Sequence, residues 1–234
     1  MDDTTIARLN ALNRTFYEIT AADFDQTRAA PWPGWDALLP HLAAPLSVLD
    51  VACGNGRFGL FLFEHLGTNV TYHGVDSNPA LLSRARAALA GHNARLELCD
   101  VLTGPLPQGA YDLVALFGML HHIPGYEGRR RFLRSLVGRV APGGLLIFAA
   151  WRFYEHERFR QRILPWPLDL VAEPGDYLLD WRRGARAPRY CHYVDDAEHA
   201  ALVAATGLRE LATYRADGHT GDVNRYSILR RDSP

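Results

Sequence analysis

The 234-residue sequence contains no lysine, so all 25 of its basic residues are arginine. Against 26 acidic residues the formal net charge is −1, which excludes a global positive field for attracting nucleic acid. No apolar run is long enough to span a membrane, and the polar first ten residues do not have the pattern of a signal peptide. The three cysteines, Cys53, Cys99 and Cys191, lack metal-like spacing. These absences predict a cytoplasmic protein with reduced thiols and no membrane contact.

From Leu46 onward, short apolar runs alternate with helical patterns. The runs LSVLDVA, TYHGVD, ARLELCD, YDLVALFG and LLIFAAW predict five strands, and APGG before the last of them predicts a turn. Strands that alternate with helices predict an α/β fold with a parallel sheet covered on both faces. The division that we predict is an N-terminal cap (1–45), a core (46–151), an irregular insertion (152–193) and a C-terminal helix with an antiparallel hairpin (194–234).

The flanking segments have their own local signals. The helix DDAEHAALVAATG is expected to begin at Asp195 or Asp196 and to end at Gly207. In the N-terminal cap a helical pattern precedes TRAAPWPGW, whose prolines predict a stiff, non-helical stretch.

The stretch VLDVACGNGRFG contains a G-x-G-x-x-G pattern at Gly54, Gly56 and Gly59. Glycines between a strand and a helix let the backbone approach a ligand, and in dinucleotide sites that ligand is a pyrophosphate. Asp50, however, would place a carboxylate near two phosphates, and like charges repel there. The loop therefore favours a cationic ligand over a dinucleotide.

S-adenosylmethionine has the required charges, because it carries a sulfonium and an ammonium and no phosphate. Asp76 ends the second predicted strand and is expected to accept hydrogen bonds from the ribose hydroxyls. Asp100 ends the third and is expected to accept from the adenine amine, with the backbone amide of Val101 beside it. Three acids at the carboxyl ends of successive parallel strands meet in one crevice. The sequence thus predicts S-adenosylmethionine as the cofactor.

The combination of DVACGNG, the later acids, FGMLHHI and APGGLLIF resembles the class I S-adenosylmethionine-dependent methyltransferases. The resemblance implies a Rossmann-like fold: a mostly parallel seven-stranded sheet with helices on both faces and an antiparallel C-terminal hairpin. It also implies a fuller set of cofactor-binding residues: Asp50, Gly54, Asn55, Gly56, Asp76, Ser77, Asp100, Val101, Phe117 and His121.

A narrower resemblance is to the tRNA wobble-uridine methyltransferases, which esterify 5-carboxymethyluridine. It rests on Thr27-Arg28 before Pro31-Trp32-Pro33, on RYCHYVDDAE and on the tail DGHTGDVNRYSILRR. A carboxylate acceptor needs a cation to orient it rather than a general base. The expected acceptor-orienting residues are Arg28, Arg189 and His192, and the expected base-stacking residues are Trp32, Tyr190 and Tyr193. Between Tyr126 and Arg189, thirteen arginines face seven acids, a local excess that would suit RNA phosphates.

Several alternatives stay open at this point. Arg28 is equally suited to the methionine carboxylate of the cofactor. The acceptor is a tRNA or a small molecule, and a non-catalytic cofactor-binding subunit is a third hypothesis. The related eukaryotic enzymes use a small protein partner, which nothing in this sequence indicates, and no oligomeric state is predicted. No metal is expected, because adjacent residues such as His121 and His122 point to different sides and chelate poorly.

Overall fold

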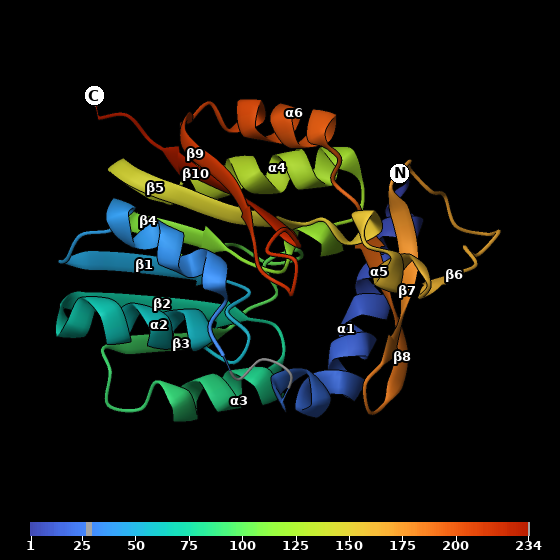
Figure 1. The fold of residues 1–234 in the computed structure, drawn as a ribbon, viewed down its shortest axis with the longest axis horizontal. Coiled ribbons are helices and arrows are strands. Elements are labelled where there is room, and N and C mark those ends of the chain that lie inside the picture. Colours follow the sequence, from blue (N-terminus) through green and yellow to red (C-terminus); the bar gives the residue numbers. More distant parts are fainter. Residues whose placement is uncertain (27–29, 234) are drawn as a thin grey trace.

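The computed structural model describes residues 1–26 and 30–233, and its centre is a seven-stranded sheet (Figure 1). The strands lie in the order β3-β2-β1-β4-β5-β10-β9. Their bounds are β1 (Leu46–Val51), β2 (Val70–Asp76), β3 (Ala94–Leu98), β4 (Tyr111–Leu116), β5 (Val140–Trp151), β9 (Arg209–Ala216) and β10 (Asn224–Arg230). The first five pair in parallel, whereas β10 pairs antiparallel with β5 and β9. The predicted fold class is confirmed.

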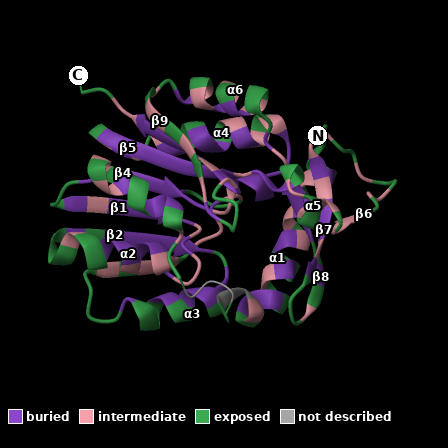
Figure 2. Cartoon of the chain, in the orientation of Figure 1, coloured by how far each residue is buried: buried purple, intermediate pink, exposed green. Residues whose placement is uncertain are grey.

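Helices cover both faces of this sheet because its strands are apolar on both sides. Along β1, Val48 packs in a cluster with Trp35 and Phe58, and its neighbour Leu49 packs in a cluster with Leu133 on the other face. The strands are accordingly buried while the outer helix faces are exposed (Figure 2). The covering helices are α2 (Arg57–Leu66), α3 (Pro79–Ala88), α4 (Tyr126–Val137), α6 (Asp196–Thr206) and the 3-10 helix η1 (Pro33–His41).

Helix α6 begins and ends where the sequence predicts. The side chain of Asp195 accepts a hydrogen bond from the amide of Glu198, and Gly207 ends the helix in the left-handed conformation at φ 67°. The remaining 3-10 turns are η2 (Gly67–Asn69), η3 (Leu120–His122) and η4 (Phe153–Glu155).

The insertion predicted to be irregular is instead a second, three-stranded antiparallel sheet. It contains β6 (Ile163–Leu164), β7 (Asp176–Arg182) and β8 (Arg186–His192), and it is preceded by the short helix α5 (Glu157–Arg160). The long helix α1 (Asp3–Gln26) lies against β8. Residues 189–192 of β8 are all buried, so the alternation that usually reveals a strand is absent.

Two further local predictions are wrong. Ala141 to Gly144 do not form a turn before a strand. They lie within β5, where the pairing with β4 jumps from Tyr111–Val140 to Leu113–Leu145. The stretch around Trp32 is also only partly non-helical, since η1 begins at Pro33 and proline is compatible with a first helical position.

Candidate functional site

A cavity of about 500 Å³ opens at the carboxyl ends of β1, β2 and β4, beside the point where the strand order reverses. One wall comes from the large sheet and its loops, and the opposite wall from α1, the end of β5, and β7–β8. The predicted cofactor-site residues found in its lining are Asp50, Gly54, Asn55, Asp76, Ser77, Asp100, Val101, Phe117 and His121. Arg189 and Trp32 also line it, whereas Arg28 lies outside the described residues.

Gly56 is the one predicted cofactor residue outside this lining. It adopts φ 80°, and a Cβ added there would lie 3.0 Å from the Cβ of Ala85. In the structure it allows the close approach of α2 to α3, and its contact with the cofactor stays a prediction.

Asp76 anchors the glycine loop. Its Oδ2 accepts a hydrogen bond from the amide of Gly54 at 2.8 Å, and its Oδ1 accepts from the amide of Asn78 at 2.8 Å. The carboxylate is buried, and burial raises its pKa against the lowering effect of these amides. Each oxygen keeps a second lone pair for a hydroxyl donor.

Asp50 is more deeply buried in the same wall. The hydroxyl of Tyr72 donates to its Oδ2 at 2.5 Å. Burial raises the pKa of Asp50 to about 7, with repulsion from Asp76 adding to the rise. A cation bound beside this carboxyl group would favour its ionised form, so the group is suited to a ligand such as a sulfonium or an ammonium.

Arg57 is a cavity residue that the sequence did not single out, although it directly follows the glycines. Its guanidinium carbon lies 4.9 Å from the ring centroid of Trp32 and 5.3 Å from that of Trp35, and burial lowers its pKa to about 10. Asp217, from the loop between β9 and β10, lines the cavity close by. Its carboxylate accepts hydrogen bonds from the amide of Gly34, the amide group of Asn224 and the hydroxyl of Tyr226.

Arg189 occupies the opposite wall and is 8 % exposed. Its guanidinium carbon lies 4.9 Å from the ring centroid of Trp151, 5.2 Å from Phe16 and 5.6 Å from Trp181. No described residue forms a hydrogen bond or ion pair with it, and its Nε is buried without a partner. Since a buried unpaired cation is costly, this side chain is arranged to receive an anion.

A hydrogen-bonded chain ties α1 to this wall. His122 Nδ1 lies 2.8 Å from the carbonyl oxygen of Tyr190, so this nitrogen carries the proton, and the Nε2 accepts from the hydroxyl of Tyr17 at 3.0 Å. Asn13 Oδ1 accepts from the amide of Tyr190 at 2.8 Å. Asn13, Tyr17 and His122 all line the cavity. Asn13 and Tyr17 have no distinctive signal in the sequence, because positions four apart on a helix usually mark an ordinary packed face.

His192 does not reach the cavity, contrary to the sequence prediction. It is 1 % exposed, and its Nδ1 and Nε2 lie 2.7 Å from Asp176 and 2.7 Å from Glu198. Burial lowers and these two carboxylates raise the pKa of His192, and the net shift is upward. The residue therefore holds β8 to β7 and α6 instead of orienting an acceptor.

The two predicted stacking tyrosines also point elsewhere. Tyr190 is fully buried and donates to Asp176 at 2.7 Å, and Tyr193 donates to Glu155 at 2.8 Å. Neither lines the cavity, where the aromatic surface beside Arg189 instead comes from Trp151, Phe159 and Trp181.

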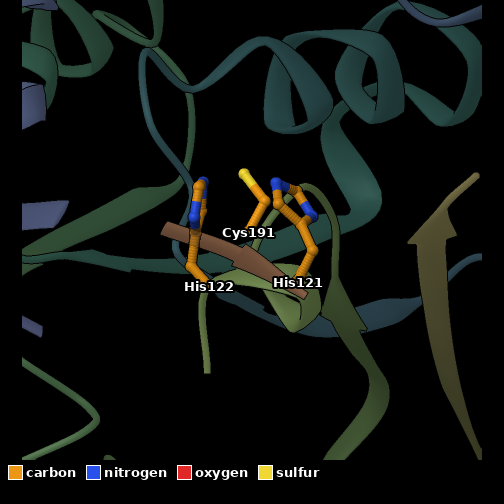
Figure 3. Close-up of side chains that lie close together, drawn as sticks. All are labelled: His121, His122 and Cys191. Atoms are coloured by element: carbon orange, nitrogen blue, oxygen red, sulfur yellow. The ribbon is translucent and has the colours of Figure 1, made fainter. Parts of the chain in front are cut away.

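His121 and His122 lie close together, which corrects the expectation that adjacent residues diverge. Their ring centroids are 4.1 Å apart, and together with Cys191 they place three donor atoms within 4.8 Å of one another (Figure 3). This donor set fits a cation poorly. Burial raises the pKa of the Cys191 thiol to about 12, and the nearby positive charge of Arg189 would repel a metal ion. The absence of a metal from this site stays a prediction.

Comparison with known proteins identifies the domain around this cavity. A family model described as a methyltransferase domain matches residues 48–144. These residues form a methyltransferase domain. The chain has the Rossmann-like fold of solved S-adenosylmethionine-dependent methyltransferases.

The relatives of the methyltransferase domain differ in what they act on. The tRNA (carboxymethyluridine(34)-5-O)-methyltransferase ALKBH8 of Macaca fascicularis is 29 % identical over 148 residues, which cover 62 % of this chain and 20 % of that protein. A probable tocopherol O-methyltransferase of Oryza sativa is 29 % identical over 143 residues, covering 58 % of this chain and 38 % of that protein. The chain therefore spans between a fifth and two fifths of the length of these relatives.

A solved structure resembles nearly the whole chain. The crystal structure of an S-adenosylmethionine-dependent methyltransferase from Methanosarcina mazei has a TM-score of 0.67 at 18 % identity, covering 87 % of this chain and 98 % of that one. This similarity extends the methyltransferase fold beyond residues 48–144. Among the described residues, no helix has the length and apolarity to cross a membrane.

Proposed function

We propose that this protein transfers the methyl group of S-adenosylmethionine to a carboxylate, and that the carboxylate belongs to a 5-carboxymethyl group on a tRNA wobble uridine. The observation that carries the proposal is Arg189: a buried guanidinium that lines the cavity without a partner among the described residues. Its planar fork matches a carboxylate through two parallel hydrogen bonds.

The proposed position of the cofactor follows from the wall that faces Arg189, which carries Asp50, Asp76 and Asp100 and which we call the cofactor wall. S-adenosylmethionine supplies a methyl group on a sulfonium whose departure leaves a neutral thioether. Asp50 faces its cationic part, Asp76 the ribose hydroxyls and Asp100 the adenine, in keeping with the charges that each can accept. Arg57 is placed to bind the methionine carboxylate, a role that the sequence left open for Arg28.

The acceptor then requires orientation more than activation. A carboxylate is already ionised and nucleophilic at neutral pH, so no general base is needed, and holding it in line with the methyl group supplies most of the rate. Arg189 is held by three aromatic rings and cannot swing freely. Trp151, Trp181 and Phe159 offer flat apolar surface for a base that has left its stack.

The tRNA assignment rests on the similarity to ALKBH8 and on the arginine excess in residues 126–189. With this assignment we propose that the protein acts in the cytoplasm, and the assignment is compatible with a small activating protein partner. Transfer to an oxygen or nitrogen of a small molecule is the second candidate, favoured by the equal identity to a tocopherol methyltransferase and by the near-neutral net charge.

Mass spectrometry of nucleosides tests the proposal. Purified protein, S-adenosylmethionine and tRNA containing 5-carboxymethyluridine should yield the methyl ester. Arg189→Leu should lower turnover about 100-fold, as expected for losing a charge-assisted pair worth ~3 kcal/mol. Arg186→Leu is the matched control, because Arg186 lies on the same strand and is exposed.

Two results would contradict the proposal. One is an unchanged nucleoside inventory with wild-type protein whose cofactor binding has been demonstrated. The other is an Arg189→Leu variant that retains full turnover on this tRNA.

A further inference from the structure

Three more arginines surround the mouth of the cavity next to Arg189. Arg162 and Arg183 line it, and Arg158 lies beside Gly218, another lining residue. No described residue forms a hydrogen bond or ion pair with the guanidinium group of any of the three. Their role rests on the proposed function and concerns how the acceptor is selected.

The acids of this segment are not available to neutralise these arginines. Each of the six acidic side chains between residues 152 and 193 is already within ion-pairing distance of another group. The pairs are Glu155 with Arg152 and Arg215, Glu157 with Arg160, Asp169 with Arg8, Glu173 with Arg129, Asp176 with His192, and Asp180 with Arg182. The segment's excess positive charge therefore lies at Arg158, Arg162, Arg183 and Arg189, together with the exposed Arg186.

Packing links these arginines to the wall of the cavity that carries Arg189 and Trp151, which we call the acceptor wall. The guanidinium carbons of Arg158 and Arg162 lie 4.7 and 6.0 Å from the ring centroid of Phe159. The ring of Phe159 lies 4.9 Å from Trp151, the same ring that Arg189 contacts. Burial lowers the pKa of Arg162, and repulsion from Arg183, Arg182 and Arg189 lowers it further. Positive charge that repels itself at a cavity mouth is relieved by a ligand with several negative charges.

Arg183 is held in place by the tip of the β7–β8 hairpin. The amide of Ala185 donates to Asp23 of α1 at 2.9 Å, which ties the tip to the N-terminal helix. The arginines at the mouth thus come from α5 and its flank (Arg158, Arg162) and from a hairpin (Arg183) that is fastened to a third element.

We propose that Arg158, Arg162 and Arg183 bind phosphodiester groups of the nucleotides that flank the methylated base. Arg189 would then take the carboxylate inside the cavity while the strand continues across the arginines outside. Arginines interleaved with an aromatic ring are typical of surfaces that bind single-stranded nucleic acid. The site would therefore bind an RNA strand more tightly than a free nucleoside.

The experiment compares two substrates that share the carboxylate. One is an anticodon stem-loop RNA with 5-carboxymethyluridine, and the other is the free nucleoside. Arg162→Ala/Arg183→Ala should raise KM for the RNA about tenfold, with kcat within twofold and unchanged kinetics on the nucleoside. The salt dependence of RNA binding should also weaken, its log–log slope falling by about 0.7 for each lost contact.

Arg131→Ala/Arg134→Ala is the matched control. Both arginines are exposed on α4, have no partner among the described residues and lie outside the cavity lining. This variant should retain the wild-type KM and salt slope. The proposal is overturned if the mouth variant loses activity equally on both substrates, if its RNA KM is unchanged, or if the control shows the same loss.

A binding measurement separates this proposal from the proposed function. Fluorescence anisotropy of a labelled, unmodified stem-loop, recorded with S-adenosylhomocysteine present, needs no turnover. If the wild-type protein methylates neither substrate, the proposed function fails, but weaker RNA binding by the mouth variant alone still supports the arginine site. Equal RNA affinity of wild type, mouth variant and control overturns it.

Discussion

The two walls of the cavity carry opposite charges and are built in different ways. The cofactor wall has Asp50, Asp76 and Asp100, all at or just beyond the ends of neighbouring strands of one sheet. The opposite wall has Arg189 on β8, with Arg162 just before β6 and Arg183 between β7 and β8 at the mouth. The difference teaches that the ends of parallel strands bring together acids that a short sequence pattern already marks, whereas the arginines come from a second sheet that has no such pattern.

The largest expected effect is at the cofactor wall. Asp76→Ala removes the acceptor for two backbone amides and for the ribose, so we expect the cofactor Kd to rise about 100-fold, or ~3 kcal/mol at ~1.5 kcal/mol per bond. Isothermal titration calorimetry measures it. Asp112→Ala is the control, since Asp112 also accepts two hydrogen bonds, both from Ser47, but lies at the amino end of β4. Wild-type affinity in Asp76→Ala would remove this residue from the cofactor site.

The second effect separates support from contact in the acceptor wall. His192→Leu leaves Asp176 and Glu198 short of a partner, and we expect it to lower the free energy of unfolding by about 2 kcal/mol, or the Tm by about 6 °C. Cofactor Kd should stay within twofold of wild type. If His192→Leu instead loses turnover while its Tm is unchanged, His192 acts on the acceptor rather than in supporting the fold.

The same variant has an expected pH dependence. The pKa of His192 is raised, so its stabilising effect is complete below pH 6.5 and is lost as the pH rises through the folded-state value. The pKa of Glu198 is lowered, so its contribution is complete above pH 4.5 and is lost in acid. The difference in stability between wild type and His192→Leu should therefore be largest between pH 4.5 and 6.5.

The third effect concerns the charge of Asp50, whose pKa of about 7 means that it is half protonated at neutral pH. A bound cation favours the ionised form, so cofactor affinity should rise about tenfold between pH 6 and pH 8, with a proton released below pH 7. Calorimetry in buffers of different ionisation enthalpy measures both quantities. Asp50→Asn should abolish the pH dependence of cofactor affinity. If the affinity of the wild-type protein does not change between pH 6 and pH 8, Asp50 does not face the cationic part of the cofactor.

The smallest effect tests the attachment of the acceptor wall to α1. Gly184 has φ 74°, and a Cβ there would lie 2.2 Å from Asp23 Oδ2. Gly207 has a similar φ of 67° with nothing within 4 Å, so Gly207→Ala incurs the backbone strain alone, about 1 kcal/mol. Gly184→Ala should lose about 1 kcal/mol more and raise the acceptor KM, measured by thermal unfolding and kinetics. Equal losses would show that the hairpin tip does not depend on this contact.

The sequence predicts the cofactor wall well because its geometry is local. A strand followed by glycines, and acids at successive strand ends, fix where Asp50, Asp76 and Asp100 lie without any knowledge of distant contacts. Arg57 follows these glycines but is not predicted, because an arginine at the start of a helix has no distinctive pattern.

The acceptor wall was predicted only in part, for a simple geometric reason. In the segment RYCH, residues three apart lie on opposite faces of a strand. Arg189 points into the cavity, whereas Tyr190 and His192 point to the other side, where both contact Asp176. Without knowing that this segment is a strand, the sequence cannot separate the two faces. Trp181 and Tyr17 are brought to the cavity by contacts between segments more than 100 residues apart.

The loop of Asp217 has a consequence for how the protein acquires its site during synthesis. Strand β10 lies between β5 and β9, and Asp217 holds the amide of Gly34 from the far end of the chain. A nascent chain that has not yet exposed residues 217–230 therefore lacks both the strand that pairs with β5 and β9 and one side of the cavity. We expect tight cofactor binding to begin only after residues 217–230 have left the ribosome.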